Sequence, residues 1–316
     1  MRRPSPIRSK QLRRRAVASP ARDLLTPILV DYNARDGSTL TMRLLATSPQ
    51  IAVGDMYPYE QKYFAYLWRW SRLLTRADWD AEEWAPRNLG SIAQERGSAL
   101  MGPPPWRHRE LMIGVVPGEA PMSETSFESV WREFSRRATA RTRVRHGRPD
   151  ADVHYYAEKH STSWRIDRHE LPPLRMLVLL RDPRDIYASL TAFRETRNVD
   201  LGRSRARDEA DDLRRFIDRQ RQRLRWIAGL PEDAETAVAR YEDLVRDLPG
   251  VARRLEDWLE VELDANSVTR DRLLGLMHGT ARTTEESIGR WRVELAPGVA
   301  ETISRELRPE LEALGL

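Results

Sequence analysis

The chain has 316 residues, a formal charge of +5 and no cysteine, and 40% of its residues are apolar. That apolar share is enough for a sizeable core, which excludes a disordered protein. The lack of cysteine excludes disulfides and thiolate metal sites, and we expect no metal. No apolar run approaches the length of a membrane span, and the N-terminus lacks the apolar segment of a secretory signal. We therefore expect a soluble, cytoplasmic protein.

The N-terminal tail, residues 1–26, is strongly basic, because its first 23 residues hold eight arginines and lysines against Asp23 alone. Such a tail could contact nucleic acid or an anionic membrane surface. A short arginine-rich terminus with prolines and serines is more typical of a disordered extension, so we expect no nucleic-acid partner. Residues 27–316 show no repeat and no break in composition, which predicts a single domain.

Strands and helices are predicted to alternate along this domain. We expect strands at 27–32, 51–53, 153–157, 174–180 and 236–241, and helices at 39–47, 57–74, 123–143, 183–194, 208–227 and 249–259. The alternation favours an α/β protein in three layers, a parallel sheet flanked by helices. The aromatic-rich segment at about 57–118 is dense in tryptophan and proline, as in substrate loops and lids.

Two segments follow an apolar run with a polar turn and a helical pattern. The first contains Gly37, which permits a tight turn, and the hydroxyls of Ser38 and Thr39. The second contains Arg181 at the strand end and Ser189 in the following helix. Such turns gather backbone N–H groups and a helix's positive end at one point, where an anion can bind. Two such points indicate a ligand with two anionic ends. Helix capping and surface ion pairs are the alternative explanations.

Four motifs in chain order resemble the sulfotransferases that use 3′-phosphoadenosine 5′-phosphosulfate (PAPS, with product PAP). They are R-x-G-S-T-L at 35–40, R-D-P-R-D-x-x-x-S at 181–189, R-Y-E-D-L-V at 240–245 and S-I-G-R-W at 287–291. The resemblance covers roughly residues 27 to 315 and implies a P-loop-like sulfotransferase fold. It also implies transfer of a sulfuryl group to a hydroxyl or amine of a small-molecule, sugar or lipid-like acceptor.

The same resemblance implies where the cofactor binds. The implied residues are Arg35, Asp36, Gly37, Ser38, Thr39 and Leu40 at the 5′-phosphosulfate, Arg181, Ser189, Ser287 and Arg290 at the 3′-phosphate, and Tyr241 near the adenine. Asp36 departs from the small residue usual in the family. A carboxylate beside an anion is unfavourable unless it points outward, so the orientation of Asp36 bears on the affinity for the cofactor.

A general base would take the proton of the acceptor. Glu60 is the first candidate, because we expect it to begin a helix whose dipole keeps it ionised, and Asp55 is the other carboxylate in this region. The segment that begins at Glu158 resembles the Glu-Lys-Thr-Pro segment of relatives. There Lys159 would support the leaving phosphate or the sulfuryl oxygens, and His160 is the second choice of base. Arg35 would meet the charge that builds on the bridging oxygen.

Two other functions stay open at this point. A nucleotide-dependent small-molecule kinase would share the strand-loop-helix geometry, but it would need Mg²⁺ and a phosphate-loop lysine that this chain lacks. A non-catalytic protein of the same fold that binds PAP or PAPS would be consistent with Asp36 and with the departures at His160 and Ser161. A homodimer is also left open.

Overall fold

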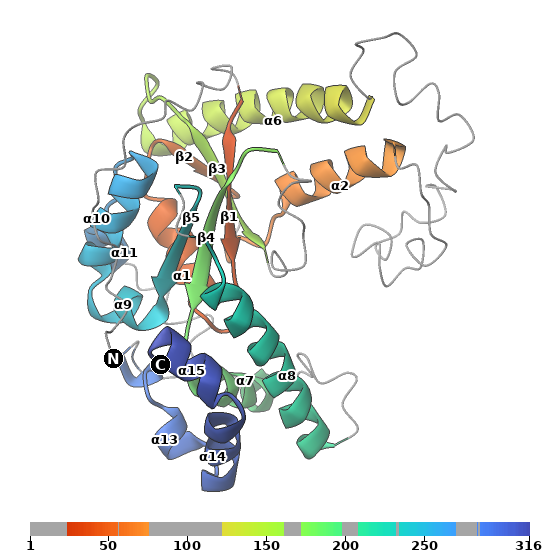
Figure 1. Ribbon diagram of the computed structural model, residues 1–316. Helices are drawn as coiled ribbons and strands as arrows, with labels where there is room; N and C mark the ends of the chain where they lie inside the picture. Colours follow the sequence, from red (N-terminus) through yellow and green to blue (C-terminus); the bar gives the residue numbers. More distant parts are fainter. Residues whose placement is uncertain are drawn as a thin grey trace.

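The computed structural model describes residues 24–55, 57–75, 122–160, 172–197, 208–231, 234–269, 283 and 285–316. Within them lies one sheet of five parallel strands (Figure 1). The strands are β1 (Thr26–Asp31), β2 (Ile51–Val53), β3 (Tyr155–His160), β4 (Arg175–Leu180) and β5 (Thr236–Arg240), in the order β2-β3-β1-β4-β5. The central position of β1 puts the first motif between the ends of β3 and β4.

Helices cover both faces of the sheet, each over its own hydrophobic core. One face carries α1 (Ser38–Leu45), α9 (Tyr241–Arg246), α10 (Leu248–Leu259) and α11 (Ala265–Thr269). The other carries α2 (Tyr63–Thr75), α6 (Met122–His146), α7 (Pro183–Arg197), α8 (Glu209–Ala228), α14 (Pro297–Glu306) and α15 (Arg308–Leu314). The short elements η6 (Glu285–Ser287) and α13 (Trp291–Glu294) precede α14. The predicted three-layer α/β class is therefore confirmed.

Strand β4 shows why the sheet is buried on both sides. Met176 and Val178 point into one core, and Leu177 and Leu179 point into the other. A parallel strand covered by helices on both faces is expected to be almost wholly apolar, and β4 is apolar from Met176 to Leu180. The continuous apolar run therefore predicted β4 to within one residue of its observed start.

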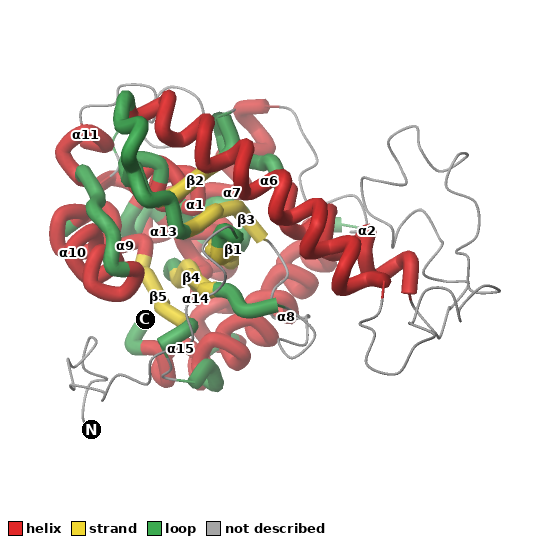
Figure 2. Tube along the Cα trace, turned by 90° about the horizontal axis from the view of Figure 1, so that it is seen from above, coloured by secondary structure: helices red, strands yellow, loops and turns green. Residues whose placement is uncertain are grey.

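Helices α2 and α6 pack along each other and extend beyond the sheet (Figures 1 and 2). Their contact is aromatic: the Phe64 ring meets Phe127 and Trp131, and Trp131 stacks on Phe134. Tyr156 of β3 packs edge-on against Trp131, with 5.7 Å between ring centroids. This aromatic cluster fixes α2 to the sheet beside β3.

Several predicted boundaries are wrong. Strand β3 begins and ends later than the predicted 153–157, and Tyr241 begins α9 instead of ending a strand. Glu60 does not begin a helix, because α2 starts at Tyr63. The tail up to residue 23, Ser161 and most of the aromatic-rich segment, 76–118, lie outside the described residues. Within the part of the chain that is described, no helix is long and apolar enough to cross a membrane.

Candidate functional site

The turn between β1 and α1 depends on Gly37. Its φ of 93° lies in the left-handed region, and a Cβ at this position would come within 2.5 Å of the Tyr241 ring. Both facts require glycine. The carbonyl of Gly37 accepts a hydrogen bond from Thr41 N at 3.0 Å, which opens α1. The turn therefore brings the backbone close to Tyr241 and presents the start of α1, at Ser38 and Thr39, at the end of the sheet. Leu40 is half-buried and packs on the core of this face.

Arg181, which follows β4, ties three segments of the site together. Its guanidinium donates to the carbonyl of Arg35 and, at 2.6 Å, to the carbonyl of Ser287. It also lies 4.0 Å from the centroid of the Tyr241 ring. The Tyr241 hydroxyl in turn lies 2.7 Å from Ser287 Oγ. The first loop, the end of β4, α9 and η6 thus meet around one buried arginine.

Arg35 and Arg290 add positive charge to this group. Arg35 Nε donates to Ser189 Oγ at 2.9 Å, which joins the first loop to α7. Burial, together with the charges of Arg181 and Arg290, lowers the pKa of Arg35 to about 10. Arg290 is 4% exposed and forms an ion pair with Glu294 at 2.6 Å. We call Arg35, Arg181, Ser189, Ser287 and Arg290 the cation cluster.

The loop that carries Arg290 is held by Asp185 of α7. Its carboxylate accepts from Gly289 N at 2.7 Å and from Trp291 N at 3.2 Å. Burial raises the pKa of Asp185, and these two hydrogen bonds oppose the shift. The acidic residue in the R-D-P-R-D motif therefore fixes the S-I-G-R-W loop against α7.

A second group of side chains lies at the end of β3. Lys159 is 1% exposed, and its Nζ donates to Glu60 Oε1 at 2.8 Å and to Thr39 Oγ1 at 3.0 Å. The Tyr32 hydroxyl donates to Glu60 Oε2 at 3.3 Å. Burial lowers the pKa of Lys159, and Glu60 opposes this shift. The Glu60 side chain remains 49% exposed, so the Lys159–Glu60 pair joins a buried cation to an accessible carboxylate.

Asp36, the residue that departs from the family pattern, is buried beneath the first loop. It is 1% exposed; its Oδ2 accepts a hydrogen bond from Asn33 N and lies 4.0 Å from an Arg223 nitrogen. Its Oδ1 has no hydrogen-bond partner among the described residues. Burial raises the pKa of Asp36 to about 7, and the charge of Arg223 opposes the shift. Asp36 is therefore part of the support beneath the loop.

The structure separates the two carboxylates that the sequence offered as a base. Glu60 meets Lys159, whereas Asp55 forms ion pairs with Arg141 and Arg145 of α6. Asp55 therefore bridges the end of β2 to α6 and does not belong to the Lys159–Glu60 pair. His160 ends β3, and its pKa is lowered by burial and by the charge of Lys62.

Sequence reasoning missed two charged residues near the site. Arg223 of α8 donates to the Asp31 carboxylate and, at 3.0 Å, to the carbonyl of Leu179, so it joins the ends of β1 and β4. Its spacing from Phe216 and Ile227 places it on the apolar stripe of α8, and a cation at such a position is a signal of a buried partner. Glu158 was quoted only as part of a motif. It is 0% exposed and accepts two backbone hydrogen bonds from α2.

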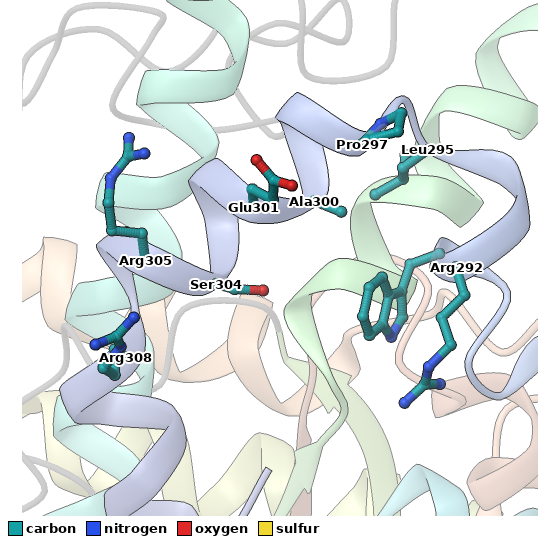
Figure 3. Close-up of a pocket in the computed structure, with 9 residues that line it drawn as sticks. Arg292, Leu295, Pro297, Ala300, Glu301, Ser304, Arg305 and Arg308 are labelled. Carbon is teal, nitrogen blue, oxygen red and sulfur yellow. The ribbon is translucent and has the colours of Figure 1, made fainter.

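A surface pocket beside α13 and α14 is distinct from these two groups (Figure 3). It is lined by Trp291, Arg292, Leu295, Pro297, Ala300, Glu301, Ser304, Arg305 and Arg308. The guanidiniums of Arg184 and Arg292 each lie 4.5 Å from the Trp291 ring centroid. All lining residues come from 291–308, so this pocket contains neither the first loop nor Lys159.

A cluster of cations around a strand-loop-helix turn, at the carboxyl ends of parallel strands, is an anion site of the α/β class. A model of the sulfotransferase family matches residues 33–265. The chain therefore belongs to the sulfotransferase family, as the four motifs indicated. No curated protein sequence matches the chain.

Three solved structures with a similar chain share less than a fifth of their residues with it. The sulfotransferase domain of the Synechococcus PCC 7002 olefin synthase is 19% identical, with 89% of this chain and 94% of that chain covered and a TM-score of 0.40. Retinol dehydratase, solved with androsterone and the inactive cofactor PAP, is 16% identical, with 94% and 83% covered and a TM-score of 0.45. A sulfotransferase from Mycobacterium avium is 16% identical, with 92% and 76% covered and a TM-score of 0.45.

Proposed function

We propose that this protein transfers a sulfuryl group from PAPS to a hydroxyl or amine of a small-molecule, sugar or lipid-like acceptor. One observation carries the proposal: the loop after β1 joins the cation cluster to the Lys159–Glu60 pair. Arg35 contacts Ser189 on one side of this loop, and Thr39 contacts Lys159 on the other. An anion site and a group able to accept a proton are therefore neighbours.

The residues present fit a ligand with two anionic groups. Burial lowers the pKa of Arg35, and repulsion from Arg181 and Arg290 adds to the shift; a bound anion would relieve this repulsion. Arg181 Nε is buried without a hydrogen-bond partner among the described residues, so the cluster retains one donor. The absence of a Cβ at Gly37 lets the turn pack directly on the Tyr241 ring, which holds Tyr241 beside the start of α1.

The donor set assigns the two ends of PAPS to different residues. Arg181, Ser189 and Arg290 would hold the 3′-phosphate through charge-assisted hydrogen bonds, with Ser287 in the same loop. The 5′-phosphosulfate would lie on the turn at Gly37, Ser38 and Thr39, and Tyr241 would border the adenine. When bound, PAPS supplies an activated sulfuryl group whose leaving group is a phosphate. By analogy with phosphoryl transfer, the protein's part is positioning and charge stabilisation.

Glu60 is the residue best placed to take the acceptor's proton. One of its oxygens is held by Lys159 and the other by Tyr32, and half of the side chain is open to an acceptor. The Lys159 ammonium, 3.0 Å from Thr39 Oγ1, places a positive charge beside the turn where negative charge develops during transfer. His160 remains the second candidate base. The cytoplasmic location and the homodimer remain predictions.

The first experiment is isothermal titration of the full chain with PAP in the absence of Mg²⁺. We expect micromolar binding that an Arg181→Ala, Ser189→Ala double variant loses. Arg175→Ala is the matched control, because Arg175 lies at the opposite end of β4 and donates to the carbonyl of Ala234. Binding of ATP with Mg²⁺ in place of PAP would overturn the proposal in favour of a kinase. PAP binding without transfer to any acceptor would indicate a non-catalytic member of the family.

A further inference from the structure

Two neighbouring residues of β3 place buried ionisable side chains on opposite faces of the sheet. Lys159 reaches Thr39 at the start of α1, on one face. Glu158 reaches α2, on the other face, where its Oε2 accepts from Phe64 N at 2.8 Å and its Oε1 accepts from Ala65 N at 3.0 Å. This follows from the alternation of side chains along a strand. The two side chains are therefore held by the same strand but contact different segments of the chain.

Glu158 serves as the N-terminal cap of α2 although it is far from α2 in the sequence. The first turn of α2 contains no acidic residue of its own, and the N–H groups at a helix start need acceptors. The carboxyl group of Glu158 supplies two oxygens to these N–H groups at the positive end of the helix. It does so at 0% exposure, where burial raises its pKa to about 8. The two N–H groups oppose this shift, because their hydrogen bonds favour the ionised form.

The anchors at Glu60 and Phe64 are only four residues apart. Lys159 holds the side chain of Glu60, and the carboxyl group of Glu158 holds the backbone N–H of Phe64. The segment between them is therefore fixed at both ends by consecutive residues of β3. Movement of the first turn of α2 would carry Glu60 with it, away from Lys159.

We propose that Glu158 is a positioning residue for sulfuryl transfer: by capping α2 it holds Glu60 against Lys159 and towards the acceptor. The inference rests on the proposed function, in which Glu60 takes the acceptor's proton. Glu158 itself contacts neither the acceptor nor the cation cluster, because its contacts run to the backbone of α2. Its loss should therefore reduce turnover without weakening the binding of PAP.

The test measures kcat, the KM for the acceptor and PAP affinity in Glu158→Ala and Glu158→Gln. We expect kcat to fall on the order of 10²-fold in Glu158→Ala, the cost typical of a displaced catalytic group. Glu158→Gln keeps one acceptor oxygen for one N–H and should recover part of this loss. PAP affinity should stay unchanged in both. Asp247→Ala is the matched control, since Asp247 caps α10 through Gly250 N at 2.9 Å and that helix holds no proposed site residue.

A double variant separates positioning from general destabilisation. If Glu158 acts through Glu60, then Glu60→Gln combined with Glu158→Gln should turn over no more slowly than Glu60→Gln alone. Losses that multiply would overturn the inference, as would wild-type kcat in Glu158→Gln and Glu158→Ala. Failure of the wild-type chain to bind PAP or to transfer sulfate would instead overturn the proposed function.

Discussion

The cation cluster and the Lys159–Glu60 pair are both built from buried charges, but their charges are balanced differently. In the cluster, Arg181 is held by two backbone carbonyls, and burial and the neighbouring guanidiniums lower the pKa of Arg35. In the pair, one ammonium meets one carboxylate at 2.8 Å. Carbonyls satisfy hydrogen bonds without cancelling charge, so the cluster keeps a positive excess that the pair does not have.

This difference indicates that the two groups have different roles in the proposed function. A positive excess attracts an anion and holds it, which suits the phosphates of a cofactor. A paired carboxylate that is half open suits a proton transfer, because its position is fixed while one side stays accessible. Breaking the two groups separately should therefore change different measured quantities.

The largest effect is expected from Glu60→Gln, which breaks the pair and leaves the cluster intact. Loss of a general base typically reduces turnover about 10²- to 10⁴-fold, so kcat should fall within this range. The affinity for PAP should not change, because Glu60 contacts Lys159 and Tyr32 and not the cluster. Steady-state kinetics and titration measure the two quantities. Asp55→Asn is the control, and an equal loss of kcat there would refute the assignment of the base.

Arg181→Met breaks the cluster and leaves the pair intact. Charge-assisted hydrogen bonds contribute about 1.5–3 kcal/mol, so PAP affinity should fall roughly 10- to 150-fold. Turnover at saturating PAPS should fall much less, because the base and its partner remain. Arg181→Lys is the informative control: it keeps the charge but cannot bridge the carbonyls of Arg35 and Ser287 as a planar fork does. A loss confined to kcat would contradict the proposal that the cation cluster binds the cofactor.

Asp36, beneath the loop that joins the two groups, should make the stability of the protein depend on pH. Its pKa is raised to about 7 in the folded protein, against a value near 4 in the unfolded chain. Between these values the folded state binds the extra proton, so this group makes stability fall as pH rises. From pH 5 to pH 7 we expect a loss of about 2 kcal/mol that Asp36→Asn abolishes. Urea unfolding of both proteins at the two pH values measures it. Glu158 is present in both proteins, so its contribution cancels in the difference between them. An equal loss of stability from pH 5 to pH 7 in both proteins would disprove the raised pKa of Asp36.

The fold and the cation cluster were largely predictable because their signals are local. The apolar run from Met176 to Leu180 predicted β4, and the order of the four motifs predicted which residues gather around Arg181. The polar residues of β3 were not predictable in this way. Hydropathy ended the strand at Ala157, because the groups that compensate Glu158 and Lys159 come from a loop and a helix more than 90 residues away.

The misassigned helix start at Glu60 and the missed Arg223 have the same cause. The cap of α2 is supplied by β3, so no capping residue in the neighbouring sequence marks the start at Tyr63. Arg223 finds its acceptor, Asp31, 192 residues away. Tertiary partners of this kind decide whether a charge is buried, and a single sequence gives no measure of which distant segments meet.

The smallest effect is expected from Ser287→Ala, which removes the side-chain hydroxyl of Ser287 and keeps its backbone carbonyl. Ser287 contributes its Oγ to the Tyr241 hydroxyl, but its carbonyl holds Arg181. The substitution removes the contact with Tyr241, worth about 1 kcal/mol, and keeps the carbonyl, so PAP affinity should fall by roughly fivefold. Tyr241→Phe should give a similar loss by removing the other end of the same hydrogen bond. If Ser287→Ala matched Arg181→Met, the hydroxyl itself would be a main contact of the 3′-phosphate, and the positive excess of the arginines would not be what holds the anion.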